Sequence, residues 1–115
     1  MEVIRVIMQR PMNIPRVMRI RNELKKFQEV CDEGYIESIH IPTITENGIT
    51  CYVNEDGKRL MLTPNFAIVV DGKVHDVVVG TALFVRHDDD GNAISLTDED
   101  IKTIVVGLKL MELIR

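Results

Sequence analysis

The chain has 115 residues, of which 45% are hydrophobic and 28% are charged, and its formal net charge is −4. This length suits one domain over residues 1–115 with a single core, and the plentiful apolar positions exclude a disordered chain. No apolar run approaches the ~20 residues that span a bilayer, and the N-terminus lacks a signal-peptide pattern. We therefore expect a cytoplasmic protein with no membrane partner.

The first predicted elements are a strand at 2–8 and a long helix. Asn13 suits a helix N-cap and Pro15 suits the first turn. Gly34 stands where a left-handed C-terminal cap is expected. Between them, apolar residues recur at spacings of three and four, which predicts a helix over 15–33. The apolar face consists of Val17, Ile20, Leu24, Phe27 and Cys31.

Short strand-like runs separated by turn signals follow. Asp71-Gly72 is a strong hairpin signal, and it joins a run at 66–70 to a long apolar strand at 74–86. That strand is apolar on both faces, as is typical of a covered central strand, and Gly80 in its middle predicts a bulge or bend. The earlier runs are 35–41, 49–54 and 59–62, with turns at Asn47-Gly48 and Asp56-Gly57.

A second helix is predicted near the C-terminus. Thr97 is the expected N-cap, three acidic residues complement the positive helix end, and Leu96 can pack onto Ile101. The helix should run to about residue 113. The element order β-α-β-β-β-β-β-α predicts an α+β fold with two helices and a mainly antiparallel sheet of five to six strands.

The last helix is apolar on more than one side, which predicts a homo-oligomer with a dimer as the first guess. One stripe, Ile101 to Met111, would face the core of its own domain. A second apolar side would form the interface with another subunit. The alternative is a helix lying in a deep groove of a monomer. The predicted interface residues are Val106, Leu110, Leu113 and Ile114.

The sequence carries no catalytic motif. It lacks G-x-S-x-G, G-x-x-x-x-G-K and G-x-G-x-x-G, so we expect no catalytic residue, with a motif-free enzyme as the open alternative. His40, His75 and His87 have no second ligand at a metal spacing, so we expect structural or surface roles, no metal and no cofactor.

The cysteines and the acidic turn also have structural interpretations. Cys31 and Cys51 do not make a disulfide framework and are expected to be small core residues. The turn 88–91, Asp-Asp-Asp-Gly, resembles a calcium loop. Arg86 and Thr97 stand where an EF-hand needs acidic ligands, so a solvated turn is the better interpretation.

Charge is distributed unevenly along the chain. Residues 1–26 carry a balance of +5 and the remaining residues a balance of −9. Such asymmetry indicates an anion-binding face, or two complementary patches that pair within or between chains. A solvated helix face is the structural alternative, and the acidic remainder with only 4% aromatic residues disfavours nucleic acid. The candidate ligand-binding residues here are Arg16, Arg19, Arg21 and Lys25.

Five short motifs follow one another along the chain: Gly34-Tyr35-Ile36-Glu37, 52–58 (Tyr-Val-Asn-Glu-Asp-Gly-Lys), Pro64-Asn65, Gly80-Thr81-Ala82 and 95–100 (Ser-Leu-Thr-Asp-Glu-Asp). In this order they resemble a family of bacterial and phage proteins catalogued as domain of unknown function thirty-eight forty-six. The resemblance covers the chain from about residue 20 onward, and it implies a phage, plasmid or conjugative-element setting, mainly in Firmicutes. It carries over no catalytic residues.

Asn54 and Asn65 match that pattern and are polar, so they are candidate ligand-binding residues, with turn roles as the structural alternative. The arginine-rich segment and the extended N-terminus depart from the family pattern, which suggests a specialised role there.

Three functional hypotheses follow. The first is a non-catalytic binding module from a mobile element that counters host defence, by sequestering an anionic small molecule such as a nucleotide signal or by blocking a host protein. The second is a purely structural or regulatory protein–protein interaction domain. The third is a small hydrolase that uses convergent acids such as Glu37 and Asp76 with a histidine.

Overall fold

The computed structural model describes the backbone of residues 2–113 and the side chains of residues 2–111. The predicted α+β class and mainly antiparallel sheet are confirmed, and the element order roughly matches the predicted one. The described strands are β1 (Val3–Gln9), β2 (Arg16–Arg21), β3 (Ile36–Ile39), β4 (Ile49–Asn54), β5 (Pro64–Val70), β6 (Lys73–Val79), β7 (Ala82–His87), β8 (Ala93–Ile94) and β9 (Glu112–Leu113). The described helices are α1 (Leu24–Val30) and α2 (Asp98–Lys109).

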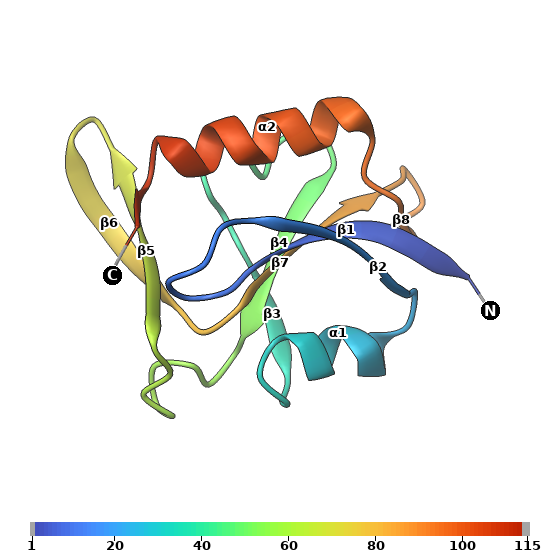
Figure 1. The fold of residues 1–115 in the computed structure, drawn as a ribbon, viewed down its shortest axis with the longest axis horizontal. Coiled ribbons are helices and arrows are strands. Elements are labelled where there is room, and N and C mark those ends of the chain that lie inside the picture. The colour runs from blue at the N-terminus through green and yellow to red at the C-terminus, as the bar shows by residue number, and fades with distance from the viewer. Residues whose placement is uncertain (1, 114–115) are drawn as a thin grey trace.

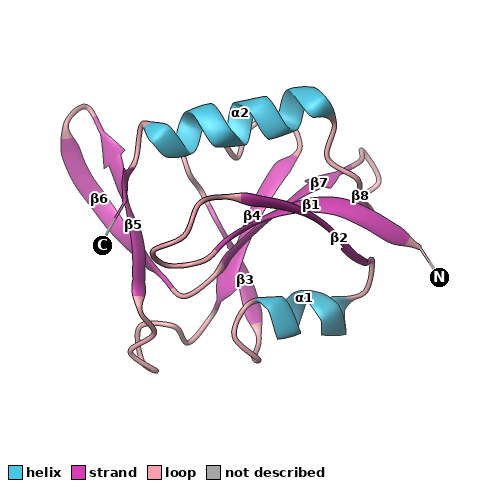
Figure 2. Cartoon of the chain, viewed as in Figure 1, coloured by secondary structure: helices cyan, strands magenta, loops and turns pink. Residues whose placement is uncertain are grey.

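The strands form two sheets. The larger has the order β2-β1-β7-β4-β3, with β8 paired to β7, and the smaller has the order β6-β5-β9. All pairings between the described strands are antiparallel. Helix α2 crosses one face of the larger sheet and α1 lies on the opposite side (Figures 1 and 2). No helix in the described part of the chain is long and apolar enough to cross a membrane.

Strand β7 is the centre of the larger sheet because it contributes to a core on each face. Phe84 packs into the core under α2, which also contains residues of the smaller sheet. Leu83 and Val85 pack into the core under α1. This confirms the predicted central strand for residues 82–87 alone. The single strand predicted over 74–86 is wrong, because the chain breaks at Gly80 (φ 75°) and β6 belongs to the other sheet.

The helix predicted over 15–33 is wrong in its first half. Residues 16–21 form β2, which pairs with β1 from Val3↔Arg21 to Met8↔Arg16. The three- and four-residue spacing arose because Ile20 on β2 and Phe27 on α1 enter the same core. The helix begins only at Leu24, after Glu23, whose side chain makes no capping bond.

Two smaller predictions are also corrected. Residues 59–62 lie in a turn, and the left-handed backbone after α1 falls on Asp32 and Glu33 instead of Gly34. The Asp71-Gly72 hairpin is confirmed, with both φ angles positive as its two-residue turn requires. The Thr97 cap is confirmed as a full capping box with Asp100.

Helix α2 approaches the loop after β3 very closely at Gly107. A Cβ at this position would overlap Cγ1 and Cδ1 of Ile44, whose side chain is fully buried. A glycine in a helix interior is normally unfavourable relative to alanine. Here the close approach requires it.

We predict that Gly107→Ala lowers the free energy of unfolding by about 1–2 kcal/mol, because overpacking outweighs the gain in helix propensity. Urea denaturation measures the change. Ile44→Ala added to Gly107→Ala should cost less than the two single changes together. Val106→Ala, on the exposed side of the same helix, is the control and should change stability little.

An ion pair anchors the start of α2 to β7. Arg86 donates two hydrogen bonds to the Asp100 carboxylate, at 2.6 and 2.7 Å, and the Asp100 side chain is 5% exposed. The Asp100 carboxylate also accepts the Thr97 backbone N–H. The Arg86 guanidinium, helped by the Thr97 bonds, lowers the pKa of Asp100.

We predict that this carboxylate makes the fold acid-sensitive. Its pKa is lower in the folded than in the unfolded state, so its stabilisation is present above about pH 4 and is lost as the pH falls through the folded pKa. Asp100→Asn should cost about 2–3 kcal/mol at pH 7, less than for a fully buried pair because Arg86 reaches solvent. Denaturation from pH 7 down to pH 2 should show this difference shrinking; a constant difference would contradict the assignment.

Candidate functional site

Three of the predicted ligand-binding cations lie on a free sheet edge. Arg16, Arg19 and Arg21 are exposed on β2, which has a neighbour only on its β1 side. We call these three residues the basic edge. The predicted flank of Arg21 and Lys25, four residues apart on one helix, is wrong because Arg21 is on β2 and Lys25 is on α1.

The basic edge lacks internal charge compensation. None of its arginines forms an ion pair with a described carboxylate. Arg19 lies directly opposite Arg5 on β1, and like charges opposite one another destabilise a sheet. Arg5 is itself occupied, because its guanidinium bonds the Leu96 carbonyl and pairs with Asp98. An anionic group brought to β2 would therefore be stabilised by Arg19 and Arg21.

Apolar side chains accompany the basic edge. Val17, between Arg16 and Arg19, is 51% exposed. Ile14 and Met12 in the loop that precedes β2 are 78% and 71% exposed. Arginine, methionine and exposed aliphatic groups around an unpaired strand are typical of a protein interface.

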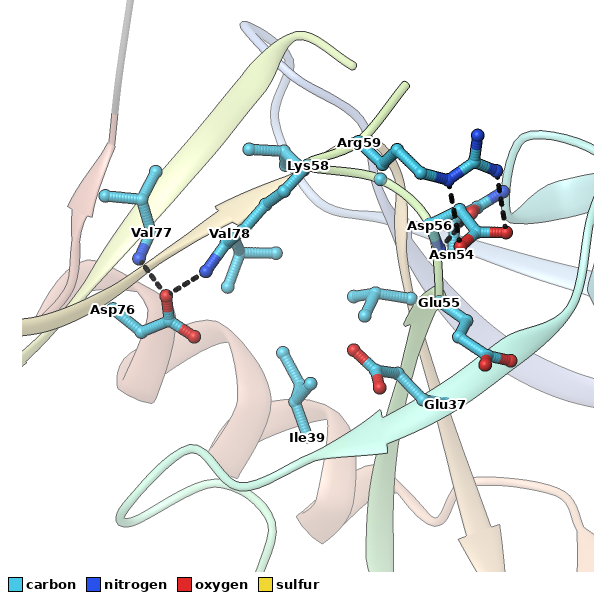
Figure 3. Close-up of a pocket in the computed structure, with 13 residues that line it drawn as sticks. Glu37, Ile39, Asn54, Glu55, Asp56, Lys58, Arg59, Asp76, Val77 and Val78 are labelled. Atoms are coloured by element: carbon cyan, nitrogen blue, oxygen red, sulfur yellow. Dashed lines mark hydrogen bonds and ion pairs between the residues drawn. The ribbon is translucent and has the colours of Figure 1, made fainter. Parts of the chain in front are cut away.

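A cleft lies between β3 and β6, each of which is the end strand of its own sheet (Figure 3). Its volume is about 150 Å³. Glu37 on β3 and Asp76 on β6 face it from opposite sides, and Val53 and Val78 supply buried apolar walls. We call it the acidic cleft, because its lining carboxylates, Glu37, Glu55, Asp56 and Asp76, outnumber its cations, Lys58 and Arg59.

Both cations of the acidic cleft are already paired. Lys58 bonds Asp76, and this bond, aided by the Val77 backbone N–H, lowers the pKa of Asp76. Arg59 pairs with Asp56 at 3.2 Å. Glu37 forms no ion pair with any described residue. The cleft therefore keeps a free carboxylate that favours a cationic group.

The cleft brings Glu37 and Asp76 together, as the hydrolase hypothesis requires, but its lining contains no histidine. His40 and His75 line a neighbouring depression that shares Asp76 with the cleft. His87 bonds Thr50 and Tyr52 instead. The arrangement supplies carboxylates without an adjacent acid–base partner, which gives the hydrolase hypothesis no support.

The cysteines and the acidic turn at 88–91 have structural roles. Both cysteines are free and buried as predicted, and burial raises the pKa of the Cys31 thiol to about 12. Asp88 accepts the backbone N–H groups of Asp90 and Asn92 within its own turn. Among residues that the structure describes, no group of three or more His, Cys, Asp and Glu side chains is placed to hold a metal ion.

The two predicted asparagines lie inside the fold. The Asn54 amide donates to the carbonyls of Cys31 and Asp32 just after α1. The Asn65 amide donates to the carbonyls of Gln9 and Gly80, both at 2.8 Å, and the side chain is 1% exposed. The amide N–H groups of both side chains are thus bonded within the fold, while the buried Oδ1 of Asn65 has no hydrogen-bond partner among the described residues. Asn54 also lines the acidic cleft, and neither residue lies beside the basic edge.

Two of the four residues predicted to form an oligomer interface have described side chains, and both are exposed. Val106 is 52% exposed and Leu110 is 65% exposed on the side of α2 away from the core. The side chain of Leu113 and all of Ile114 lie outside the described residues. The oligomer therefore stays a prediction at this surface.

The sequence comparison identifies the family. A profile described as a domain of unknown function (DUF3846) matches residues 4–109. The chain belongs to this family. The family description assigns no activity, so residue roles have to come from the geometry. No curated protein and no solved structure gives a significant match.

Sequence reasoning found the basic residues but missed that they form a sheet edge. A signal was present: residues 3–8 and 16–21 are two similar apolar–basic runs, and Pro11 and Pro15 stand between them. Such a pattern is typical of a hairpin. The acidic cleft carried no such signal, since its two walls come from strands of separate sheets.

We predict that Asn65→Ala lowers the free energy of unfolding by about 2–4 kcal/mol, because it leaves two buried carbonyls without donors. Thermal and urea denaturation measure the loss. Asn92→Ala, in the exposed turn after β7, is the matched control and should cost less than about 0.5 kcal/mol. Wild-type stability in Asn65→Ala would show that this amide does not hold the two sheets.

Proposed function

We propose that this domain is a non-catalytic protein-recognition module that captures an acidic, extended segment of a partner protein on its basic edge. The observation that carries the proposal is the free outer edge of β2, whose exposed arginines lack carboxylate partners among described residues. An extended segment added to β2 would gain backbone hydrogen bonds, and its acidic side chains would meet Arg19 and Arg21.

The shape of the surface supports a protein segment over a small anion. The depression beside Arg19 and Arg21 also contains Glu23 and an ion pair between Lys26 and Glu29, so its carboxylates offset part of the positive charge that a compact phosphate group would need. An extended protein segment spreads its carboxylates along its length, so that each can reach a different arginine of β2. The exposed Val17 and Ile14 supply apolar contacts that a nucleotide signal would not use.

The setting that the family resemblance implies, a phage, plasmid or conjugative element, makes a host protein the expected partner. Binding of this kind would block the partner's own interaction without chemistry. An anionic small molecule is the second candidate ligand, and a comparison of nucleotide and peptide binding distinguishes it from a protein segment.

We predict that a synthetic peptide of alternating Glu and Val residues binds the domain, while the matched peptide of alternating Lys and Val residues does not. Amide shifts in an NMR titration should change most along β2. The double variant Arg19→Glu/Arg21→Glu should weaken the Glu-Val peptide by at least about tenfold, since two charge contacts become repulsive.

The control is Lys102→Glu/Lys109→Glu, which makes the same charge change on exposed positions of α2. It should leave peptide binding within about twofold, because those sites are off the edge strand. Equal weakening by both variants would show a net-charge effect and contradict a β2 site. A melting shift with nucleotides and none with the Glu-Val peptide would favour the small anion.

A further inference from the structure

We propose that copies of this chain associate head to tail, with the basic edge of one copy added to the outer side of β3 in the next. This inference rests on the proposed function, because it names an acidic segment that the basic edge accepts. The two surfaces are the opposite ends of one sheet, whose order begins at β2 and finishes at β3.

The two ends carry opposite, uncompensated charge. Arg19 and Arg21 form no ion pair with a described carboxylate, and Glu37 forms none with a described cation. The acidic cleft beside β3 adds Asp76, Asp56 and Glu55, whose charges Lys58 and Arg59 only partly offset. The same chain therefore presents both halves of an electrostatically complementary contact.

The charged side chains at the two ends of the sheet also lie on the same face. Glu37 lies opposite Val53, which belongs to the core under α2. On β2, Val17 lies opposite Ile7 of that same core, so Arg19 and Arg21, two and four residues further on, share this face. When β2 of one copy pairs with β3 of the next so that Arg19 or Arg21 lies opposite Glu37, all three side chains point to the same face of the sheet. Both arginines then lie toward Glu37 and the acidic cleft.

Strand direction permits the contact by translation combined with rotation. Four antiparallel steps lead from β2 through β1, β7 and β4 to β3, so β2 and β3 run the same way. Moving one copy along the sheet, with a rotation that follows the sheet twist, then places its β2 parallel to β3 of its neighbour, which is an ordinary ladder.

Two-fold arrangements through either edge are disfavoured. Pairing β2 with β2 would set arginines against arginines, and pairing β3 with β3 would set Glu37 against Glu37. A head-to-tail contact leaves one edge of each type free, so it continues into rings or filaments instead of stopping at a dimer. Self-association also covers β2, so an acidic partner would have to displace the neighbouring copy.

Complementation between two edge variants tests the inference. Glu37→Arg removes the acidic half, and Arg19→Glu/Arg21→Glu removes the basic half; all three positions are exposed. Sedimentation equilibrium should show wild type growing beyond a dimer with concentration and shrinking as salt is raised. Each variant alone should associate about a hundredfold more weakly. An equimolar mixture should regain association and grow beyond a heterodimer, because every contact between the two variants again joins edges of opposite charge.

Lys102→Glu/Lys109→Glu should assemble as wild type does, and Leu110→Glu should assemble as well. Loss of assembly with Leu110→Glu but not with Glu37→Arg would overturn the inference in favour of the exposed face of α2. A wild type that stays monomeric while the Glu-Val peptide still binds β2 overturns head-to-tail association alone. A monomer that also ignores the peptide overturns the proposed function with it.

Discussion

The buried amide of Asn65 is the polar contact that joins the two sheets beside the apolar core that they share. From β5 it reaches the carbonyl of Gln9 at the end of β1 and the carbonyl of Gly80 between β6 and β7. The chain has to leave one sheet and enter the other at Gly80, and this break exposes a backbone carbonyl that needs a donor. Asn65 supplies the donor and so holds β6 beside the larger sheet without joining it.

The acidic cleft follows from that arrangement. Because β6 is turned away from β7 at Gly80, it faces β3 across a gap instead of continuing the ladder. The space between the two strands is bounded by Val53 and Val78 and carries Glu37 on one side and Asp76 on the other (Figure 3). The hydrogen bonds of Asn65 thus help to place the charged side chains of β3 and β6 on either side of the acidic cleft.

The larger sheet is left with two ends of opposite character. Exposed strand edges usually carry charge that discourages pairing with other chains. Here the arginines of β2 would repel another β2, and Glu37 would repel another β3, yet each favours the other. Charge on these edges would therefore select between partners as well as protect the fold. Under the proposed function, an acidic strand of this chain and one of a different protein would compete for the same β2.

Local signals were sufficient where an element is decided within a few residues. The Thr97 capping box and the Asp71-Gly72 turn depend on neighbours in sequence, and both were predicted. The segment 15–33 failed because Ile20 and Phe27 keep a helical spacing while belonging to a strand and a helix. Pairing of β2 with β1 decided the outcome, and a spacing rule contains no information about that partner.

By itself the sequence determined the α+β class, the start of the final helix, the buried cysteines and the uneven charge, since these depend on composition and local pattern. The predicted end of that helix near residue 113 was wrong, because α2 ends at Lys109 and residues 112–113 pair with β5. Only the tertiary structure decided that the arginines form a sheet edge, that Glu37 and Asp76 share a cleft, and that Asn65 joins two sheets. These features need contacts between residues far apart in the chain, and such contacts follow from strand order and from which backbone groups remain unpaired.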